Sequence, residues 1–228
     1  MEQRKLMSLE FKQSPSLISN IEVTVLNANE LDIKVDSLDF VNLDRDNYQI
    51  IIWQNNLTPP YEALNENVLT IENIPSNSSK AAMTIKCDSL GVNFYNGVYC
   101  VGFLMGDKPS SVCSFSSLVS GTEVSVFQSA VYISSVGVSQ VSVGFVTPVN
   151  NNPELNRQYI DIFDAEGSIN RDSVLNIRGN FSSSAVGQLV LHIKEGVKLE
   201  RGKSYRVLYD FNGDFESYGA EAFFTMPK

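Results

Sequence analysis

The sequence predicts an all-β protein built from two β-sandwiches in tandem. Short segments alternate between apolar and polar residues with a period of two, which is typical of half-buried strands. Turn residues separate these segments at regular intervals, and no helical run of any length occurs. The order of segments in the first half also returns in the second half, about 110 residues later. The repeat therefore predicts one sandwich per copy.

The stretch from Val197 to Tyr209 carries the most specific signal. It contains a leucine, a turn around Gly202, and then a strand that alternates Tyr205, Val207 and Tyr209. A tyrosine at this place sits where a strand crosses from one sheet to the other, and its hydroxyl bonds to the backbone upstream, an arrangement called the tyrosine corner. A weaker copy, which includes Tyr99, spans residues 96–103.

The first half contains about seven predicted strands. They are expected at 21–25, 31–35, 48–53, 67–71, 82–87, 98–104 and 111–118. The second half repeats six of them in the same order. They are expected at 131–133, 141–145, 159–163, 191–194, from 205 to 209, and at 222–224. We therefore predict an N-terminal arm at 1–16, a first sandwich at 17–124 and a second at 128–228, with the boundary in the Ser-, Gly- and Thr-rich chain at 121–130.

The arm at 1–16 has some apolar character. Leu6, Leu9 and Phe11 supply it, and Ser14-Pro15-Ser16 separates the arm from the first sandwich. Chain termini fray unless they are tied down, so the arm is either a frayed end or a segment that docks on a partner. Because three apolar residues fall in so short a segment, we expect docking and count these three among the interaction residues.

Composition excludes some classes of partner. The chain has 228 residues, a net charge of -9 and a pI of about 4.6, and its one basic cluster is Arg4-Lys5. Nucleic-acid and anionic-membrane binding both need a basic face, so we expect neither. No apolar stretch has the roughly 18 residues that span a bilayer. Charges at Glu10 and Lys12 interrupt the N-terminus, which does not have the pattern of a secretory leader, although removal of a leader stays open.

The cysteines are three in number, at Cys87, Cys100 and Cys113. An odd number in a chain without a recognisable leader predicts reduced thiols, and the spacing fits no zinc site. Alternation along the strand at 98–104 points Cys100 outward. Cys113 could then lie opposite it across a turn, so a Cys100–Cys113 disulfide is the alternative.

The second repeat resembles a fibronectin type III domain. The resemblance rests on Leu199-x5-Tyr205-x-Val207-x-Tyr209 and covers residues 128–228; the first repeat matches less well. The family's early tryptophan is absent, while Trp53 lies on the third strand, where immunoglobulin domains carry theirs. The chain therefore resembles immunoglobulin-like or fibronectin type III-like sandwiches. That resemblance implies a fold and a habit of mediating contacts, not a reaction.

Catalytic residues are not evident. His192 is the one histidine, and its strand pattern turns it to the surface, where it has no nucleophile to activate. No nucleophile-elbow, Walker A or dinucleotide motif occurs. The loop at 210–216 has three carboxylates, so it is either a hairpin around Asn212-Gly213 or a calcium site; we expect the hairpin, and no metal or cofactor.

Aromatic residues gather in the same loop. In the family that the chain resembles, this loop, between strands F and G, often contacts partners. We therefore add Phe211, Phe215 and Tyr218 to the interaction residues; folding back onto the core is the alternative.

The function that these features favour is a non-enzymatic structural or adaptor protein. The chain resembles the small immunoglobulin-like subunits of tailed-bacteriophage virions, which are made in the host cytoplasm and built into head, neck or tail. That resemblance implies other protein subunits as partners, an oligomeric assembly and a place in the virion. The alternative is a carbohydrate- or protein-binding module of a bacterial surface or secreted protein, which predicts a row of exposed aromatic residues on one sheet face. A metal-dependent enzyme would need carboxylates that converge from both repeats.

Overall fold

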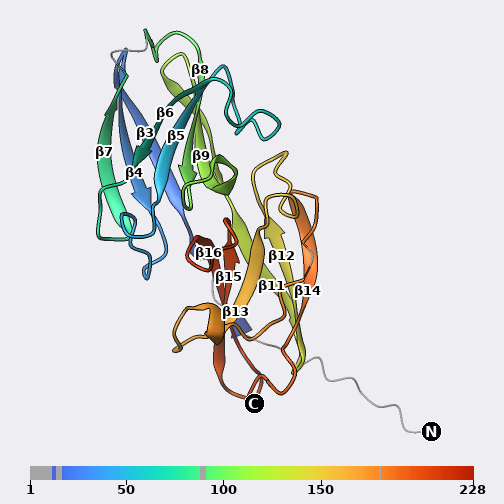
Figure 1. Cartoon of the computed structure of the whole chain (residues 1–228). Coiled ribbons are helices and arrows are strands. Elements are labelled where there is room, and N and C mark those ends of the chain that lie inside the picture. The colour runs from blue at the N-terminus through green and yellow to red at the C-terminus, as the bar shows by residue number, and fades with distance from the viewer. Residues whose placement is uncertain (1–11, 14–16, 88–90, 180) are drawn as a thin grey trace, which may run out of the picture.

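The computed structural model describes residues 12–13, 17–87, 91–179 and 181–228, and it is built almost wholly of β-strands. Figure 1 shows two sandwiches stacked end to end. The predicted all-β class and the tandem immunoglobulin-like or fibronectin type III-like architecture are confirmed. In each sandwich the first two strands form one sheet with a later strand, which is the fifth strand of the first sandwich and the fourth of the second, and the other strands form the facing sheet.

The first sandwich pairs a three-stranded sheet with a five-stranded one. The three-stranded sheet has the order β3-β4-β7, with β3 at Asn20–Asn27, β4 at Glu30–Asp36 and β7 at Lys80–Lys86. The other sheet has the order β10-β9-β8-β5-β6. Its strands are β5 (Gln49–Gln54), β6 (Val68–Asn73), β8 (Val98–Leu104), β9 (Val112–Val119) and β10 (Thr122–Gln128). A short 3-10 helix, η2 (Pro109–Ser111), precedes β9.

The second sandwich has a three-stranded sheet of the same kind. Its order is β11-β12-β14, with β11 at Ala130–Val136, β12 at Gln140–Val146 and β14 at Val186–His192. The facing sheet contains β13 (Tyr159–Asp164), β15 (Ser204–Asp210) and β16 (Tyr218–Thr225). The 3-10 helix η3 (Arg171–Ser173) comes after β13, and Asn170 caps it through its side chain.

The edge at β16 is extended by the N-terminal part of the chain. β1 (Lys12–Gln13) and β2 (Leu17–Ile18) both pair antiparallel with β16. Strands of the first sandwich lie between Asn20 and Gln128, and the remaining strands of the second lie between Ala130 and Thr225. The division of the chain at 17–124 and 128–228 stays a prediction.

Alternation of apolar and polar residues produces the two cores. On β3 and β4 side chains alternate between buried and more exposed positions, and β5 and β13 are buried on both faces. The sequence of β5 is nearly continuous in apolar residues, whereas β13 also buries Asp161. Both tyrosine corners are present. The Tyr205 hydroxyl accepts the backbone N–H of Glu200 at 2.7 Å, and the Tyr99 hydroxyl donates to the carbonyl of Asn93 at 3.0 Å.

The cysteines are buried reduced thiols, as predicted, and the disulfide alternative is wrong. Cys100 lies opposite Ser117, not Cys113. It does point to the outer side of its sheet, but Trp53 and Phe115 join it there in a second small apolar cluster. The indole N–H of Trp53 donates to the carbonyl of Leu64, which fixes the loop that covers this cluster. Within the described residues, no helix is both long and apolar enough to cross a membrane.

Candidate functional site

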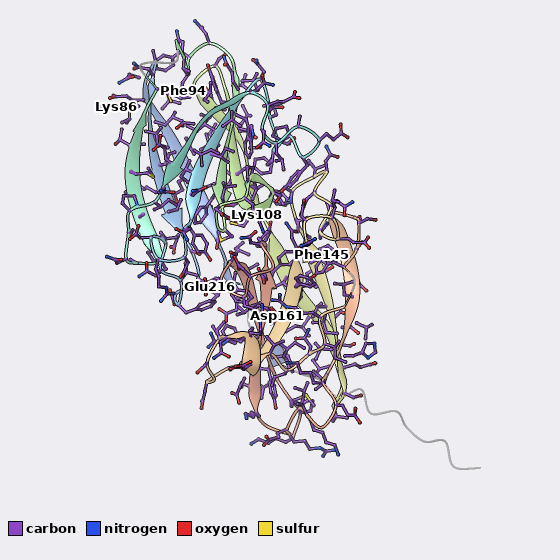
Figure 2. All side chains as sticks on the ribbon, in the orientation of Figure 1. Lys86, Phe94, Lys108, Phe145, Asp161 and Glu216 are labelled. Atoms are coloured by element: carbon purple, nitrogen blue, oxygen red, sulfur yellow. The ribbon has the colours of Figure 1, made fainter. Side chains whose placement is uncertain are left out.

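The two sandwiches meet in a buried junction. Ser129, between β10 and β11, is buried and donates its N–H to the carbonyl of Cys113. Across the junction, the Tyr48 hydroxyl donates to the carbonyls of Glu216 and Tyr218, at 3.2 and 3.3 Å. Phe40 meets the edge of the Tyr218 ring, with 6.4 Å between centroids. These contacts connect the two sandwiches. Lys108 and Glu216 mark the region in Figure 2.

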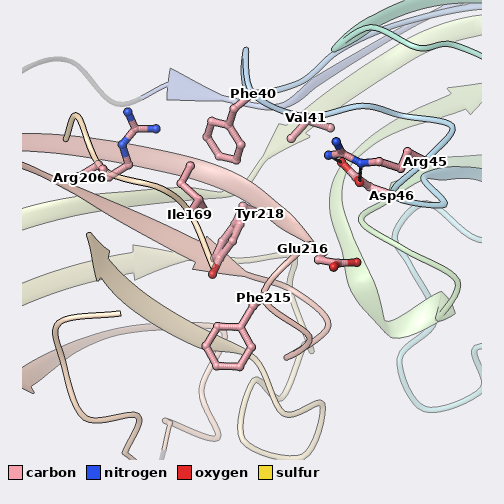
Figure 3. A pocket seen from close by; sticks show the side chains of 10 residues that line it. Phe40, Val41, Arg45, Asp46, Ile169, Arg206, Phe215, Glu216 and Tyr218 are labelled. Carbon is pink, nitrogen blue, oxygen red and sulfur yellow. Dashed lines mark hydrogen bonds and ion pairs between the residues drawn. The ribbon is translucent and has the colours of Figure 1, made fainter. Parts of the chain in front are cut away.

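A groove of about 550 Å³, which we call the junction groove, opens beside these contacts. Both sandwiches line it, and Figure 3 shows the side chains that converge there. The lining residues are Phe40, Val41, Arg45, Asp46, Gly167, Ile169, Arg206, Phe215, Glu216 and Tyr218. Binding sites of this size occur preferentially at domain interfaces, so the junction groove is the candidate functional site.

The first sandwich contributes the loop between β4 and β5 to the junction groove. Asp46 accepts the backbone N–H of Asn42, and Asn42 accepts that of Arg45, so the loop is closed by its own side chains. Such bonds are the usual reason that Asn and Asp favour turns. Leu43 and Tyr48 are buried on either side and anchor the loop. The guanidinium of Arg45 is paired with Asp46 at 2.6 Å, at the rim of the groove.

The second sandwich supplies the loop between β15 and β16, which two aspartates organise. Asp210 accepts the backbone N–H groups of Asn212, Gly213 and Phe215, and Asp214 accepts those of Glu216 and Ser217. The loop is therefore longer than a tight Asn-Gly hairpin. These carboxylate oxygens are engaged by donors of their own loop, and the described residues contain no group of three or more His, Cys, Asp or Glu placed to hold a metal ion.

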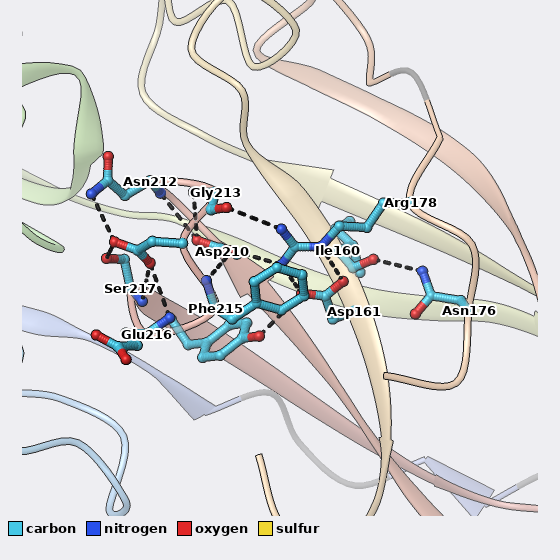
Figure 4. Close-up of polar contacts among 12 residues, drawn as sticks. Ile160, Asp161, Asn176, Arg178, Asp210, Asn212, Gly213, Phe215, Glu216 and Ser217 are labelled. Carbon is cyan, nitrogen blue, oxygen red and sulfur yellow. Dashed lines mark hydrogen bonds and ion pairs between the residues drawn. The ribbon is translucent and has the colours of Figure 1, made fainter. Parts of the chain in front are cut away.

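Behind the loop lies a buried ionic network centred on Arg178 (Figure 4). The guanidinium bonds to both carboxylate oxygens of Asp161, one of them at 2.8 Å, and to Asp210 at 2.7 Å. The ring of Phe215 covers the guanidinium, with 3.3 Å between its centroid and Cζ. Tyr218 donates its hydroxyl to Asp161 at 3.1 Å. The network thus fixes two side chains that line the groove.

Burial shifts the acidities in this network. Desolvation raises the pKa of Asp210 to about 6, although Arg178 opposes the shift. Desolvation and the neighbouring Asp161 raise the pKa of the Tyr218 hydroxyl, which therefore stays a donor. Hydrogen bonds and charges from Asp161 and Asp210 raise the pKa of Arg178 against the effect of its burial.

A second charge pair lies at the other end of the groove. Arg206 pairs with the buried Glu221 at 3.5 Å, and its guanidinium also lies over Phe40, 5.7 Å from the ring centroid. Desolvation raises the pKa of Glu221 to about 7, against the pull of Arg206. Arg206 Nε and Glu221 Oε1 are buried without a hydrogen-bond partner.

The groove combines apolar walls with charged ends. It has apolar walls of Phe40, Ile169 and Phe215, with arginine–carboxylate pairs at its ends. His192 is exposed on β14 and does not line the groove. This composition suits an apolar side chain flanked by polar backbone.

The predicted interaction residues differ in where they lie. Phe211 and Tyr218 are buried and Phe215 is partly buried, so the contacts of this loop are made within the chain itself. Of these residues, Phe215 and Tyr218 line the junction groove. Leu6, Leu9 and Phe11 lie outside the described residues. The use of all six in binding a partner stays a prediction.

Sequence reasoning missed the part of the groove contributed by other elements. Phe40 and Arg45 come from a loop with no aromatic cluster, and Arg206 sits on the tyrosine strand, where the alternation predicts an ordinary outward residue. The one available signal was the polar run at 44–47, which marks a structured loop rather than a site.

Comparison with known proteins finds similarity among solved structures. No protein family model and no curated protein matches the sequence. Among solved structures, the FN1–FN3 domains of chicken CNTN1 are similar at 12% identity and a TM-score of 0.28, over 90% of this chain and 63% of that one. The chain thus spans less than two thirds of that structure. The two tandem V-type regions of VCBP3, a v-region-containing chitin binding protein, are similar at 10% identity and a TM-score of 0.26, over 93% and 100% of the chains.

Proposed function

We propose that this chain is a non-enzymatic structural or adaptor protein that holds other protein subunits, with the junction groove as one point of contact. The observation that carries the proposal is that one groove is lined by two sandwiches whose junction is buried. A partner seated there contacts both sandwiches at once. Fixed geometry lowers the entropy lost on binding, which suits a part that must hold neighbours in register.

The finer proposal is that the assembly is a bacteriophage virion and that the chain belongs to its head, neck or tail. The buried contacts between the two sandwiches support this, because repeated subunits in a symmetric particle need one defined shape. An acidic surface, with a net charge of -9, also keeps unassembled copies apart in solution.

The test is quantitative mass spectrometry of washed particles, made by a host that carries this gene and its neighbours. We expect the chain at a fixed copy number per particle. Ile169→Asp places a charge on the apolar wall of the groove and is expected to lower incorporation. Val149→Asp, at an exposed position that does not line the groove, is the matched control. Absence of the chain from washed particles would contradict the virion proposal.

The binding-module alternative has less support from the side chains. Two large aromatic residues are exposed in the described part of the chain. They are Tyr95, in a loop, and Tyr132, on β11. Neither has a second exposed aromatic beside it on its sheet, so a row on which sugar rings could stack is missing from the described faces. Glycan-array screening of the purified chain tests this alternative directly.

A further inference from the structure

One side of the second sandwich is open. In the first sandwich, β6 extends the five-stranded sheet beyond β5. The described part of the second sandwich has no strand at the matching place beside β13. Asn176 lies there instead and bonds through its side chain to the backbone of Ile160 and Ile162. A cavity of about 170 Å³ remains between β13 and β14. Ile160, Ile177, Phe181, Leu189 and Leu191 give it apolar walls.

The edge of β14 beside this cavity carries unpaired backbone groups. Ile193 donates its N–H to Ser139 on the β12 side, whereas the carbonyl of His192 accepts the N–H of Ile177 on the other side. Backbone groups alternate along a strand, so Val186, Gln188 and Val190 direct theirs away from β12. No described strand pairs with them. Figure 1 shows β14 at the outer edge of the second sandwich.

The matching edge of the first sandwich is protected. β7 and β14 have the same alternation of exposed and buried residues, which aligns Lys80 with Val186 and Thr84 with Val190. Lys80 is paired with Asp36 across the face of its sheet. Lysines on edge strands discourage the pairing of further strands. β14 has none, and Val186 and Val190 are 55% and 51% exposed. β14 is therefore the edge open to strand addition.

The N-terminal segment has the sequence that such an edge accepts. Met7, Leu9 and Phe11 alternate with Ser8 and Glu10, so that a strand at 7–11 would have one apolar face. The residues next along the chain already act in this way, because β1 and β2 add to the edge at β16. We propose that residues 7–11 of a second copy add to β14 as a strand, and that their apolar side chains cover the cavity beside it.

The donor must be a second copy because the chain's own segment cannot reach. Lys12 is paired with Thr225 on β16. The strand order β1-β16-β15-β13 puts three strand spacings, about 14 Å, between β1 and the edge at which the cavity lies. Phe11 is adjacent to Lys12, and consecutive Cα atoms are about 3.8 Å apart. A strand at 7–11 therefore lies beyond reach of β14 in its own chain.

Charge also favours the N-terminal segment of a second copy as the donor. The chain has a net charge of -9, and Arg4-Lys5 is its one basic cluster. A donor segment that carries this cluster lowers the repulsion between two acidic copies. The outer face of the acceptor strand adds no charge of its own, because Val186, Gln188 and Val190 are neutral.

The first test measures self-association of the full chain by light scattering coupled to size-exclusion chromatography, over a range of concentrations. We expect concentration-dependent assembly. Val190→Lys places on β14 a lysine of the kind that protects edge strands, and it should weaken self-association at least about tenfold, since a lysine at an apolar contact is costly. Leu9→Asp, in the donor segment, should also weaken self-association. Thr84→Lys, at the matching position of β7, should leave self-association unchanged.

The second test locates the contact by mixing two cysteine variants under oxidising conditions. Ser8→Cys or Glu10→Cys on the donor is expected to form a disulfide with Gln188→Cys on the acceptor, and not with Ala82→Cys, the matching position on β7. The native cysteines are buried and do not compete. A chain that stays monomeric at all concentrations, or one that assembles equally well with Val190→Lys, would overturn the proposal.

Discussion

The hydroxyl of Tyr48, in the first sandwich, donates to the backbone carbonyl of Tyr218, in the second, at a distance of 3.3 Å. Both side chains are fully buried, and 170 residues separate them in the sequence. Burial raises the pKa of the Tyr48 hydroxyl, so that it remains a donor at physiological pH. The bond ties the start of β5 to the loop that forms one wall of the junction groove. The junction is therefore part of the folded core.

Removal of this hydroxyl is expected to loosen the junction. Tyr48→Phe leaves the carbonyls of Glu216 and Tyr218 without their donor, which should lower the free energy of unfolding by about 1 kcal/mol. Urea unfolding measures the change. Tyr95→Phe, at an exposed position, is the control. Equal stability of the Tyr48 variant and the wild type would show that the bond adds nothing.

Arg178 is expected to be the most sensitive charged position. Arg178→Met leaves two buried carboxylates, Asp161 and Asp210, without their cation, at a cost of about 3–5 kcal/mol. Thermal and urea unfolding measure the loss. Arg171→Met removes an exposed arginine that also lies over Phe215, at 5.0 Å, and should cost far less.

A second variant separates charge from packing at this position. Asp161→Asn combined with Arg178→Met removes one of the two unpaired charges and should recover part of the loss. If the double variant is no more stable than Arg178→Met alone, unpaired charge is not the cause. The packing of Phe215 on the guanidinium would then account for the effect.

Glu221 is expected to make stability depend on pH. Its pKa is raised from 4.5 to about 7 by desolvation, so the folded state binds this proton more tightly than the unfolded chain does. The stabilisation is fully present below pH 4.5 and is lost as the pH rises through about 7. Glu221→Gln keeps the neutral form at every pH. It should match the wild type near pH 4.5 and exceed it by about 3 kcal/mol at about pH 8.

Urea unfolding at both pH values provides the measurement, and the acidic sample is the internal control. Asp210, whose pKa is raised to about 6, destabilises both proteins in the same direction as the pH rises. The difference between variant and wild type therefore isolates Glu221. A gain of equal size in the acidic and the alkaline sample would contradict a titrating carboxylate.

Local patterns predicted most of the fold. The alternation at 21–25 and 31–35 corresponds to β3 and β4, and the tyrosine strand is β15. Three strands were missed, namely β1, β2 and β10. The chain at 121–130 has the composition of a boundary rich in small polar residues, yet it contains β10, whose side chains are largely exposed. A strand with little burial leaves a weak apolar signal, because its order comes from pairing with β9.

The candidate site was less predictable than the fold. Phe40, Phe215 and Arg206 come from three separate elements, and no local pattern relates them. The aromatic loop was recognised, and the burial of Phe211 and Tyr218 matches the alternative that these side chains fold back onto the core. Burial there depends on where the first sandwich sits, which is set by contacts at long range in the sequence.

The two tyrosine corners test whether that junction makes one cooperative unit. Tyr205→Phe removes the acceptor for the Glu200 N–H, and Tyr99→Phe removes a donor to the Asn93 carbonyl. Each change should lower the free energy of unfolding by about 1 kcal/mol. If the buried junction couples the sandwiches, both variants should lower the midpoint of one shared thermal transition. Calorimetry distinguishes this from two separate transitions, of which each variant would shift only its own. Tyr132→Phe, at an exposed position on β11, controls for loss of a hydroxyl alone. Because Tyr48 and Ser129 are buried where the sandwiches meet, we expect the shared transition.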